Sequence, residues 1–240
     1  MLIDAISSAR FIGQEESNQL IKKIKGLASD KQAYRLSNQI HIDNRVVCED
    51  KSLRLNIDKL HNAIQQRKAI KFRYGRYNLQ KEFEERNPGK LYKVEPYGLV
   101  WNDGFYYLVG FSVKLEKIIN YRVDRMRQLS VAEESFNKDY FNLAEHTNKC
   151  FNMYPGEVYH IKIKFDNHLI NAIIDRFGRD VKIEIFNEEK FILSTKAALT
   201  EGLVRWILNW GSDAEVLYPN ILVEKVKKEI EKMYEIYYRQ

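Results

Sequence analysis

The chain has 240 residues, enough for one large domain or two small ones. Hydrophobic residues make up 45% of it and charged residues 30%, as in ordinary globular proteins, and no apolar run approaches the roughly 20 residues of a membrane-spanning helix. Asp4 and Arg10 interrupt the N-terminal stretch, which therefore lacks the apolar core of a signal peptide. We expect a cytoplasmic protein.

The net charge is +6, and it is unevenly distributed. Between Leu55 and Ala132, 15 lysines and arginines stand against eight acidic residues, whereas the rest of the chain is close to neutral. A basic segment of this kind favours an anionic partner such as a nucleotide or a nucleic acid. The competing interpretation is a basic surface that only aids solubility.

The residues that usually carry catalysis or bind metal form no recognisable motif. Cys48 and Cys150 are far apart and form no Cys-x-x-Cys pair, so a disulfide framework is not indicated. None of the five histidines lies at a metal-ligand spacing from another histidine or cysteine. A nucleophile elbow, a phosphate-binding loop and a dinucleotide-binding glycine motif are all missing. We therefore expect no metal, no cofactor and no enzymatic activity.

In chain order, residues 1–54 are predicted to be a helical linker or dimerisation segment, in which Gln14–Leu27 carries an apolar helical stripe. A second helix is expected from Asn56, acting as its N-cap, to about Arg67. The alternation of apolar and basic residues in Ala69–Tyr74 predicts a half-buried strand. Another strand is expected around Leu79–Glu84.

A β-hairpin is the clearest local prediction. Two runs rich in aromatic and β-branched residues, Val94–Trp101 and Phe105–Phe111, flank the tight-turn sequence Asn102–Gly104. A further strand is expected at Ile118–Val123. Five strands and one helix over residues 55–135 predict a small, strongly bent β-barrel of the Sm/SH3-like type.

Faces within this hairpin follow from alternation. Strict alternation places Lys93, Tyr97 and Trp101 on one face of the first strand. Gly98 and Gly110 lie inside the two strands, and interior glycines often mark the bulge or bend that a small barrel needs.

The second half of the chain predicts a separate α+β module. Residues 136–156 are polar and weakly patterned, as expected for a linker. A strand at Val158–Phe165 is followed by a helix with Asp166 as its cap and Gly178 at its end. A hairpin, a helix, a short strand and a long last helix after Pro219 follow. This βαββαβ order plus a helix, over residues 157–240, is typical of a ferredoxin-like module.

Candidate ligand-binding residues come from the barrel. Arg122 and Arg125 present planar guanidinium groups that suit a phosphate or a carboxylate, and Tyr97 and Tyr107 offer a stacking ring and a hydroxyl. Two other interpretations compete: an arginine that pairs with a neighbouring carboxylate, and a Tyr107 that belongs to the core. By strict alternation the two arginines face opposite sides, so a shared site requires a twist or bulge between them.

Three further residues complete the predicted ligand-binding set. Tyr74 follows Ile70 and Phe72 on one strand face, which favours the core, but its place at the strand end brings it near the predicted site. Lys93 and Arg76 add positive charge, although a solvated surface position is the more common role of such side chains.

Three blocks of this region resemble the signature of the WYL domain. They are Glu95–Leu99, Gly104–Gly110 and Tyr121–Met126, and the tripeptide that names the family stands here as Tyr106-Tyr107-Leu108. The resemblance implies a Sm-like barrel in which the arginines of the third block line a basic ligand pocket. The segments at residues 2–24 and 203–219 similarly resemble the flanking regions of WYL-family transcription regulators, in which a winged helix-turn-helix precedes the first segment.

The resemblance and the residues together lead to one hypothesis and one alternative. The hypothesis is the ligand-sensing and dimerisation part of a transcriptional regulator, which binds an anionic effector (a nucleotide, an oligonucleotide or a single-stranded nucleic acid). It would act as a homodimer, and duplex DNA would be read only by a winged helix upstream of Met1. The alternative is a stand-alone accessory protein that binds RNA or a protein partner, for instance to modulate an antiviral nuclease.

Overall fold

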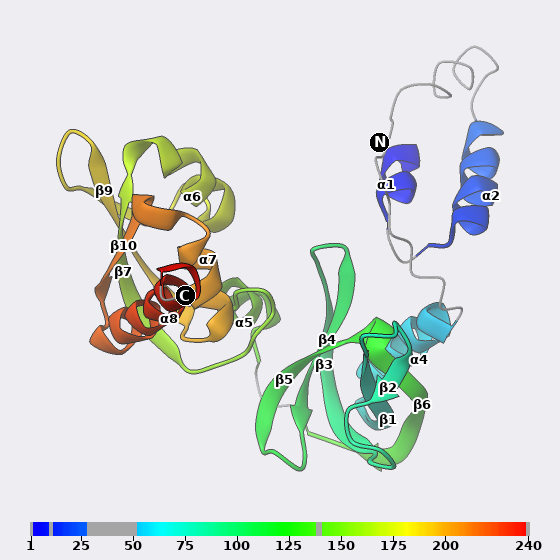
Figure 1. The fold of residues 1–240 in the computed structure, drawn as a ribbon. Helices are drawn as coiled ribbons and strands as arrows, with labels where there is room; N and C mark the ends of the chain where they lie inside the picture. Colours follow the sequence, from blue (N-terminus) through cyan, green and yellow to red (C-terminus); the bar gives the residue numbers. More distant parts are fainter. Residues whose placement is uncertain (1, 10–11, 28–51, 138–140, 239–240) are drawn as a thin grey trace. The chain divides into compact units, whose positions relative to one another are not determined.

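The computed structural model describes residues 2–9, 12–27, 52–137 and 141–238 (Figure 1). It divides into two compact units, residues 1–139 and residues 140–240. At the N-terminus, α1 (Leu2–Ser8) is followed by α2 (Gln14–Lys25), which agrees with the apolar stripe of this segment. The polar stretch after it, with Cys48, lies outside the described residues. Among the helices described, none is long and apolar enough to cross a membrane.

Helix α4 (Ser52–Gln66) covers the sheet of the first unit (Figure 1). It begins one turn earlier than predicted, because the stripe that faces the sheet already starts at Leu53, which is 4% exposed. Asn56 is therefore not the N-cap. It is a buried residue inside the helix, and its Nδ2 donates a hydrogen bond to the carbonyl oxygen of Met126 at 3.3 Å.

The first unit contains a six-stranded, curled antiparallel sheet, one strand more than predicted. Its order is β2-β1-β3-β4-β5, and β6 pairs with β1. The strands are β1 (Lys68–Tyr77), β2 (Phe83–Glu85), β3 (Tyr92–Asn102), β4 (Phe105–Ser112), β5 (Lys117–Arg122) and β6 (Met126–Ser135). The short strand β2 begins later than the sequence indicated, since residues 78–82 form the turn that precedes it.

The β3–β4 hairpin is the one that the sequence predicts. Asp103 and Gly104 have φ angles of 50° and 77°, the left-handed pair that a two-residue hairpin turn requires. The pairing register shifts between Pro96 and Gly98, opposite Gly110. This shift confirms the bulge that the strand glycines indicated, with Tyr97 as the extra residue. A Cβ atom at Gly110 would lie 2.6 Å from Val94 Cγ1, so the close approach of the two strands requires glycine there.

The bulge changes the faces of β3. Before it, Val94 points into the core, and after it Leu99 packs against the same core. Trp101 shares the face of Leu99, and its ring packs edge to face on Tyr106, another residue at the core. Lys93 therefore lies on the face opposite Trp101, and the prediction that these two residues share a face is wrong.

The second unit is built around a four-stranded antiparallel sheet of order β10-β7-β9-β8. Its elements are α5 (Leu143–Lys149), β7 (Val158–Asp166), α6 (Ile170–Phe177), β8 (Lys182–Ile185), β9 (Lys190–Ala198), α7 (Glu201–Leu208), β10 (Ala214–Tyr218) and α8 (Asn220–Tyr238). From β7 onward, the order of strands and helices is the predicted one. The fold class is α+β.

Two predictions for this unit are wrong in detail. Asp166 occupies the N-cap position of a short 3-10 turn, Asn167–Leu169, that precedes α6, but its side chain makes no capping hydrogen bond and its carboxylate pairs with Lys190 Nζ at 2.6 Å. The expected linker contains α5, which Asn142 caps by accepting a hydrogen bond from the backbone NH of Glu145 at 3.0 Å. Gly178 does end α6, with a φ of 84° and an NH bonded to Ile174 O.

Candidate anion-binding site

Four of the seven predicted ligand-binding residues lie together at one place in the first unit. Arg122 ends β5, and its register partner on β4 is Tyr107. The backbone NH of Arg122 donates a hydrogen bond to the Tyr74 hydroxyl at 3.1 Å. Arg125 lies in the 3-10 turn Val123–Arg125 that joins β5 to β6. This turn ends the strand alternation after Arg122, so the two arginines are not held on opposite sides of one strand.

Arg122 is held by neighbouring side chains. Its Nη2 and Nε donate to the two carboxylate oxygens of Asp124 at 2.7 and 3.1 Å, the bidentate geometry typical of this pair. Its guanidinium lies over the Phe105 ring, 3.5 Å from the centroid. Burial alone would lower the pKa of Arg122, but Asp124 more than offsets it and the pKa is raised. Arg122 is therefore a fixed cation, and one of the sequence-based alternatives, pairing with a carboxylate, holds for it.

Arg125 differs from Arg122 in having no fixed counter-charge. Within the described part of the chain, no hydrogen bond and no ion pair holds its guanidinium. Its positive charge nevertheless acts on the hydroxyls of both Tyr74 and Tyr107, which places the charge beside them. The cluster thus contains one neutralised and one uncompensated arginine.

The two tyrosines of the cluster are neutral hydrogen-bonding groups. Burial raises the pKa of Tyr74 and the pKa of Tyr107, and the nearby arginine charges only partly oppose the rise. Both phenols therefore keep their protons at neutral pH, and each hydroxyl is able to donate to an anion.

Tyr107 and Tyr74 are attached to the sheet in different ways. Leu108, the neighbour of Tyr107, points into the core, so Tyr107 faces the other side of β4 and the alternative that it is a core residue is wrong. Tyr74 packs on the core rings of Phe72 and Tyr121, with centroids 6.2 and 5.4 Å away, while its hydroxyl reaches Arg122. It belongs to both the core and the cluster.

The other three predicted residues lie elsewhere. Lys93 Nζ pairs with Glu134 at 3.1 Å, near the end of the β3–β4 hairpin that is remote from its turn. Arg76 Nε pairs with Glu84 at 2.8 Å across β1 and β2. The Tyr97 ring stacks on Phe136 at a centroid distance of 6.1 Å.

Sequence reasoning missed Phe105 as part of the site. Its ring supports the Arg122 guanidinium because Phe105 lies two residues before Tyr107 on the same strand face, next to the strand that carries Arg122. The apolar character of that face is visible in the sequence, where it also fits a core position. An aromatic residue on the same face as a cross-strand arginine is the signal that would have identified it.

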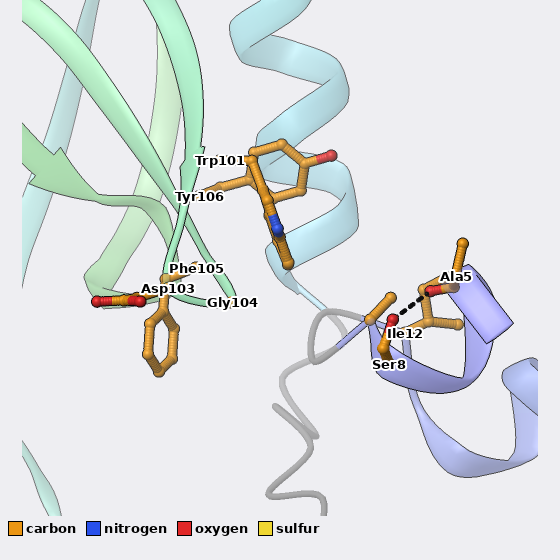
Figure 2. A pocket seen from close by; sticks show the side chains of 9 residues that line it. Ala5, Ser8, Ile12, Trp101, Asp103, Gly104, Phe105 and Tyr106 are labelled. Carbon is orange, nitrogen blue, oxygen red and sulfur yellow. Dashed lines mark hydrogen bonds between the residues drawn. The ribbon is translucent and has the colours of Figure 1, made fainter. Parts of the chain in front are cut away.

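A hollow of the first unit lies beside the hairpin turn. It has a volume of about 910 Å³ and is open to solvent, with a lining of Ala5, Ser8, Ala9, Ile12, Trp101, Asp103, Gly104, Phe105 and Tyr106. Trp101 and Tyr106 extend from one side of the hairpin, whereas Phe105 and Asp103 extend from the other (Figure 2). Phe105, whose ring carries the Arg122 guanidinium, is one of the lining residues, so the hollow adjoins the arginine cluster at the hairpin turn.

Comparisons with known proteins cover both units. Residues 56–131 match the WYL domain, and residues 157–234 match the WCX domain. Among curated proteins, none matches the sequence. Similar solved structures include proteasome accessory factor B/C (PafBC) of Arthrobacter aurescens, with 15% identity and a TM-score of 0.34 over 86% of this chain and 30% of that one.

A second solved structure, described as a CRISPR Cas-related protein, has 16% identity and a TM-score of 0.48. The match covers 78% of this chain and 53% of the CRISPR Cas-related protein. The present chain thus spans less than two thirds of either protein, and at these TM-scores the likeness carries no argument about function.

Proposed function

The chain belongs to the WYL-domain family, with a WCX domain after its WYL domain, and from this premise we propose that it is the ligand-sensing and dimerisation part of a transcriptional regulator. The ligand is an anionic effector: a nucleotide, an oligonucleotide or a single-stranded nucleic acid. The chain binds this effector and does not transform it. A protein with this role works in the cytoplasm.

One observation carries the proposal: Arg125 is a half-buried cation with no carboxylate partner among the described residues, beside two protonated tyrosines. A guanidinium removed from water without a counter-ion costs free energy, and an incoming phosphate would recover it. Arg122 presents a second guanidinium whose position Asp124 and Phe105 have already fixed. Less side-chain entropy is then lost when the ligand binds.

The seven predicted ligand-binding residues have different roles, according to whether they lie inside or outside the arginine cluster. Arg122 and Arg125 bind phosphate oxygens, and Tyr107 and Tyr74 donate hydrogen bonds to the ligand. Lys93 and Arg76 are paired with carboxylates outside the cluster, and we assign them no direct contact. Tyr97 has one ring face on Phe136 and serves as a structural residue at the bulge.

The finer architecture belongs to the same proposal. The curled sheet of the first unit is taken as a Sm-like barrel and the second unit as a ferredoxin-like module. The regulator works as a homodimer, and a winged helix elsewhere in the protein contacts duplex DNA. A ligand changes transcription only if it binds two states of this dimer with different affinities.

The proposal is tested by fluorescence anisotropy of labelled single-stranded oligonucleotides over a series of salt concentrations. Wild-type protein should bind with an affinity that falls as salt rises. Arg125→Ala should weaken binding at low salt by about tenfold, as expected for the loss of a hydrogen-bonded ion pair with phosphate. Arg122→Ala should have a similar effect.

The matched control is Arg76→Ala, which removes the same side chain from an exposed ion pair of the same sheet. It should leave the affinity within about a factor of two. If oligonucleotides fail to bind at low salt and nucleotides also fail in calorimetry, the anionic-effector proposal is wrong. Equal losses in the Arg76 and Arg125 variants would show a non-specific charge effect instead of a site.

A further inference from the structure

One face of the sheet in the second unit does not pack on α6, α7 or α8. The other face packs on α6, α7 and α8 through core residues such as Ile163, Phe165 and Leu193. In Figure 1 these three helices gather on one side of strands β7, β9 and β10. The alternate residues point away from the helices. On β7 and β9 they are His160, Lys162, Lys164, Asp166, Lys190, Ile192, Ser194 and Lys196.

Ser194 is an unusual residue on this face. It is only 6% exposed, and its hydroxyl is fully buried without a hydrogen-bond partner. Its register partners are Lys162 on β7 and Lys182 on β8, so a lysine stands on either side of it in the row across the sheet. A buried hydroxyl with no partner costs free energy relative to alanine, and such groups call for a specific explanation.

The charges around Ser194 are not balanced. Three lysines of this face pair with carboxylates: Lys164 with Glu215, Lys190 with Asp166 and Lys182 with Glu184. Lys162 and Lys196 have no ion pair within the described residues. Since Lys162 is the direct neighbour of Ser194, the unsatisfied hydroxyl lies beside an ammonium group that forms no ion pair among the described residues.

The carboxylate of Glu184 is a negative group that already lies near Lys162 and Lys182. A hydrogen bond from Lys182 lowers the pKa of Glu184, and the charge of Lys162 lowers it further. Lys162 and Lys182 come from strands on opposite sides of β9, so their charges converge on one carboxylate. The carboxylate belongs to an exposed side chain, and an external anion is able to displace it.

We propose that Ser194, Lys162 and Lys182 form a second anion site of this protein, one that binds a phosphate group. The Ser194 hydroxyl donates a hydrogen bond to a phosphate oxygen, and the two ammonium groups neutralise its charge. Lysine side chains rotate readily, so Lys162 and Lys182 are able to move aside and expose the Ser194 hydroxyl to the phosphate. The Glu184 carboxylate then leaves Lys182. The phosphate comes either from a free small molecule or from the backbone of a single-stranded nucleic acid laid on this face of the sheet.

Phosphate fits the row better than a carboxylate does. Its additional oxygen atoms and second charge allow one oxygen on each ammonium group and another on the hydroxyl. The single charge of Glu184 already contacts Lys182, and Ser194 still has no partner in that arrangement. The site is independent of the arginine cluster, which belongs to the other unit.

The test uses the full chain with Arg122→Ala and Arg125→Ala, so that binding at the first site does not mask the second. One arm measures inorganic phosphate by isothermal titration calorimetry, and the other measures a labelled oligothymidylate by fluorescence anisotropy. For whichever probe binds, Ser194→Ala should weaken the affinity by about tenfold, as expected for the loss of a hydrogen bond to a charged group. Lys162→Gln should weaken it further, and Glu184→Gln should strengthen it.

Ser194→Ala also separates binding from folding. Because the hydroxyl has no partner in the protein, its removal should leave the melting temperature unchanged or raise it, while binding falls. Lys227→Gln is the control, since Lys227 is an exposed, ion-paired lysine on α8. The proposal is overturned if neither probe binds, or if affinity is the same in the Ser194, Lys162 and Glu184 variants as in their parent. Oligonucleotide binding that wild type shows and the parent lacks reports on the first site, whereas binding that remains in the parent and falls with Ser194→Ala reports on this one.

Discussion

Tyr107 lies on the sheet face opposite Leu108, which points into the core. Removing its hydroxyl oxygen alone therefore tests whether the arginine cluster binds a ligand. Tyr107→Phe removes one hydrogen-bond donor and leaves the ring. We expect the affinity for an anionic ligand to fall about fivefold, in line with the loss of one hydrogen bond, and the melting temperature to stay close to that of wild type. Titration by anisotropy and a thermal melt check both. An unchanged affinity would remove Tyr107 from the site.

Phe105 acts on the ligand through Arg122. Phe105→Leu keeps an apolar side chain but removes the ring that lies 3.5 Å from the guanidinium. We expect ligand affinity to fall about threefold, because a cation–π contact of about 0.5–1 kcal/mol no longer fixes Arg122. In an Arg122→Ala background the same change should have no effect on binding. A double-mutant cycle from these four proteins measures the coupling, and strictly additive losses would contradict the mechanism.

The buried tyrosines also predict how stability depends on pH. Burial raises the pKa values of Tyr74, Tyr107 and Tyr121 above their ordinary value of about 10. At neutral pH these phenols are protonated in both states, and pH has no effect through them. Above about pH 10 the unfolded chain loses protons that the folded chain keeps, so stability should decrease as pH rises. Urea unfolding followed from neutral to alkaline pH tests this, and Tyr107→Phe should make the decrease shallower.

At the level of elements, the close approach of β3 and β4 depends on Gly110. In Gly110→Ala the new Cβ meets Val94 Cγ1 at 2.6 Å and the Glu95 carbonyl oxygen at 2.7 Å. Because one of these atoms is backbone, the strands have to separate, and we expect a loss of about 1–3 kcal/mol in the free energy of unfolding. Gly13→Ala is the control, since nothing lies within 4 Å of its Cβ position. Similar unfolding midpoints in urea for both variants would contradict the packing described.

Helix α4 is held on the sheet by its apolar stripe. Leu60 is fully buried, whereas Leu55 on the same helix is 62% exposed. Leu60→Ala should lower the free energy of unfolding by about 2–5 kcal/mol, while Leu55→Ala should change it by less than about 0.5 kcal/mol. Chemical denaturation of the two variants provides the comparison. Comparable losses would show that the helix is not docked as described.

Local signals predicted the elements well where neighbouring residues alone decide the structure. The Asp103-Gly104 turn and the Gly178 helix end are set by φ angles that few residues adopt, and both are found as predicted. The side chains of Asn56 and Asp166 do not cap a helix, for a different reason. Each residue type suits an N-cap, but tertiary contacts decide its place: a hydrogen bond to Met126 for one and an ion pair with Lys190 for the other.

The candidate site was only partly predictable because strand alternation breaks down in two places. The bulge at Tyr97 reverses the faces of β3, so Lys93 could not be placed correctly relative to Trp101. The 3-10 turn after Arg122 releases Arg125 from the strand pattern. Neither irregularity follows from the periodicity of the sequence. The residue types were informative, and their grouping required the structure.

At the scale of the whole molecule, α8 bears on the proposed dimer. Of its 19 residues only Leu222 is buried within the described part of the chain, and Met233 and Tyr237 are 45% and 75% exposed. We expect Met233→Glu with Tyr237→Glu to convert a dimer into a monomer, because charges on this surface oppose its burial. Sedimentation velocity at several concentrations measures this. Lys228→Glu is the control, and a wild-type monomer at all concentrations would refute the proposed dimer.

The extra residue at Tyr97 also constrains how the length of this chain is able to change. Deletion of Tyr97 itself would bring the pairs Pro96–Gly110 and Gly98–Val109 next to each other, so Leu99 and Trp101 would keep their face. Deletion of one residue between Gly98 and the turn would instead exchange the faces of neighbouring side chains. Among related sequences, single-residue losses in this strand should therefore occur at the bulge. The turn at residues 113–116, which joins β4 to β5, should also vary one residue at a time. An alignment gap of one residue at Tyr97 would thus mark a hairpin that lacks the bulge and keeps its two faces.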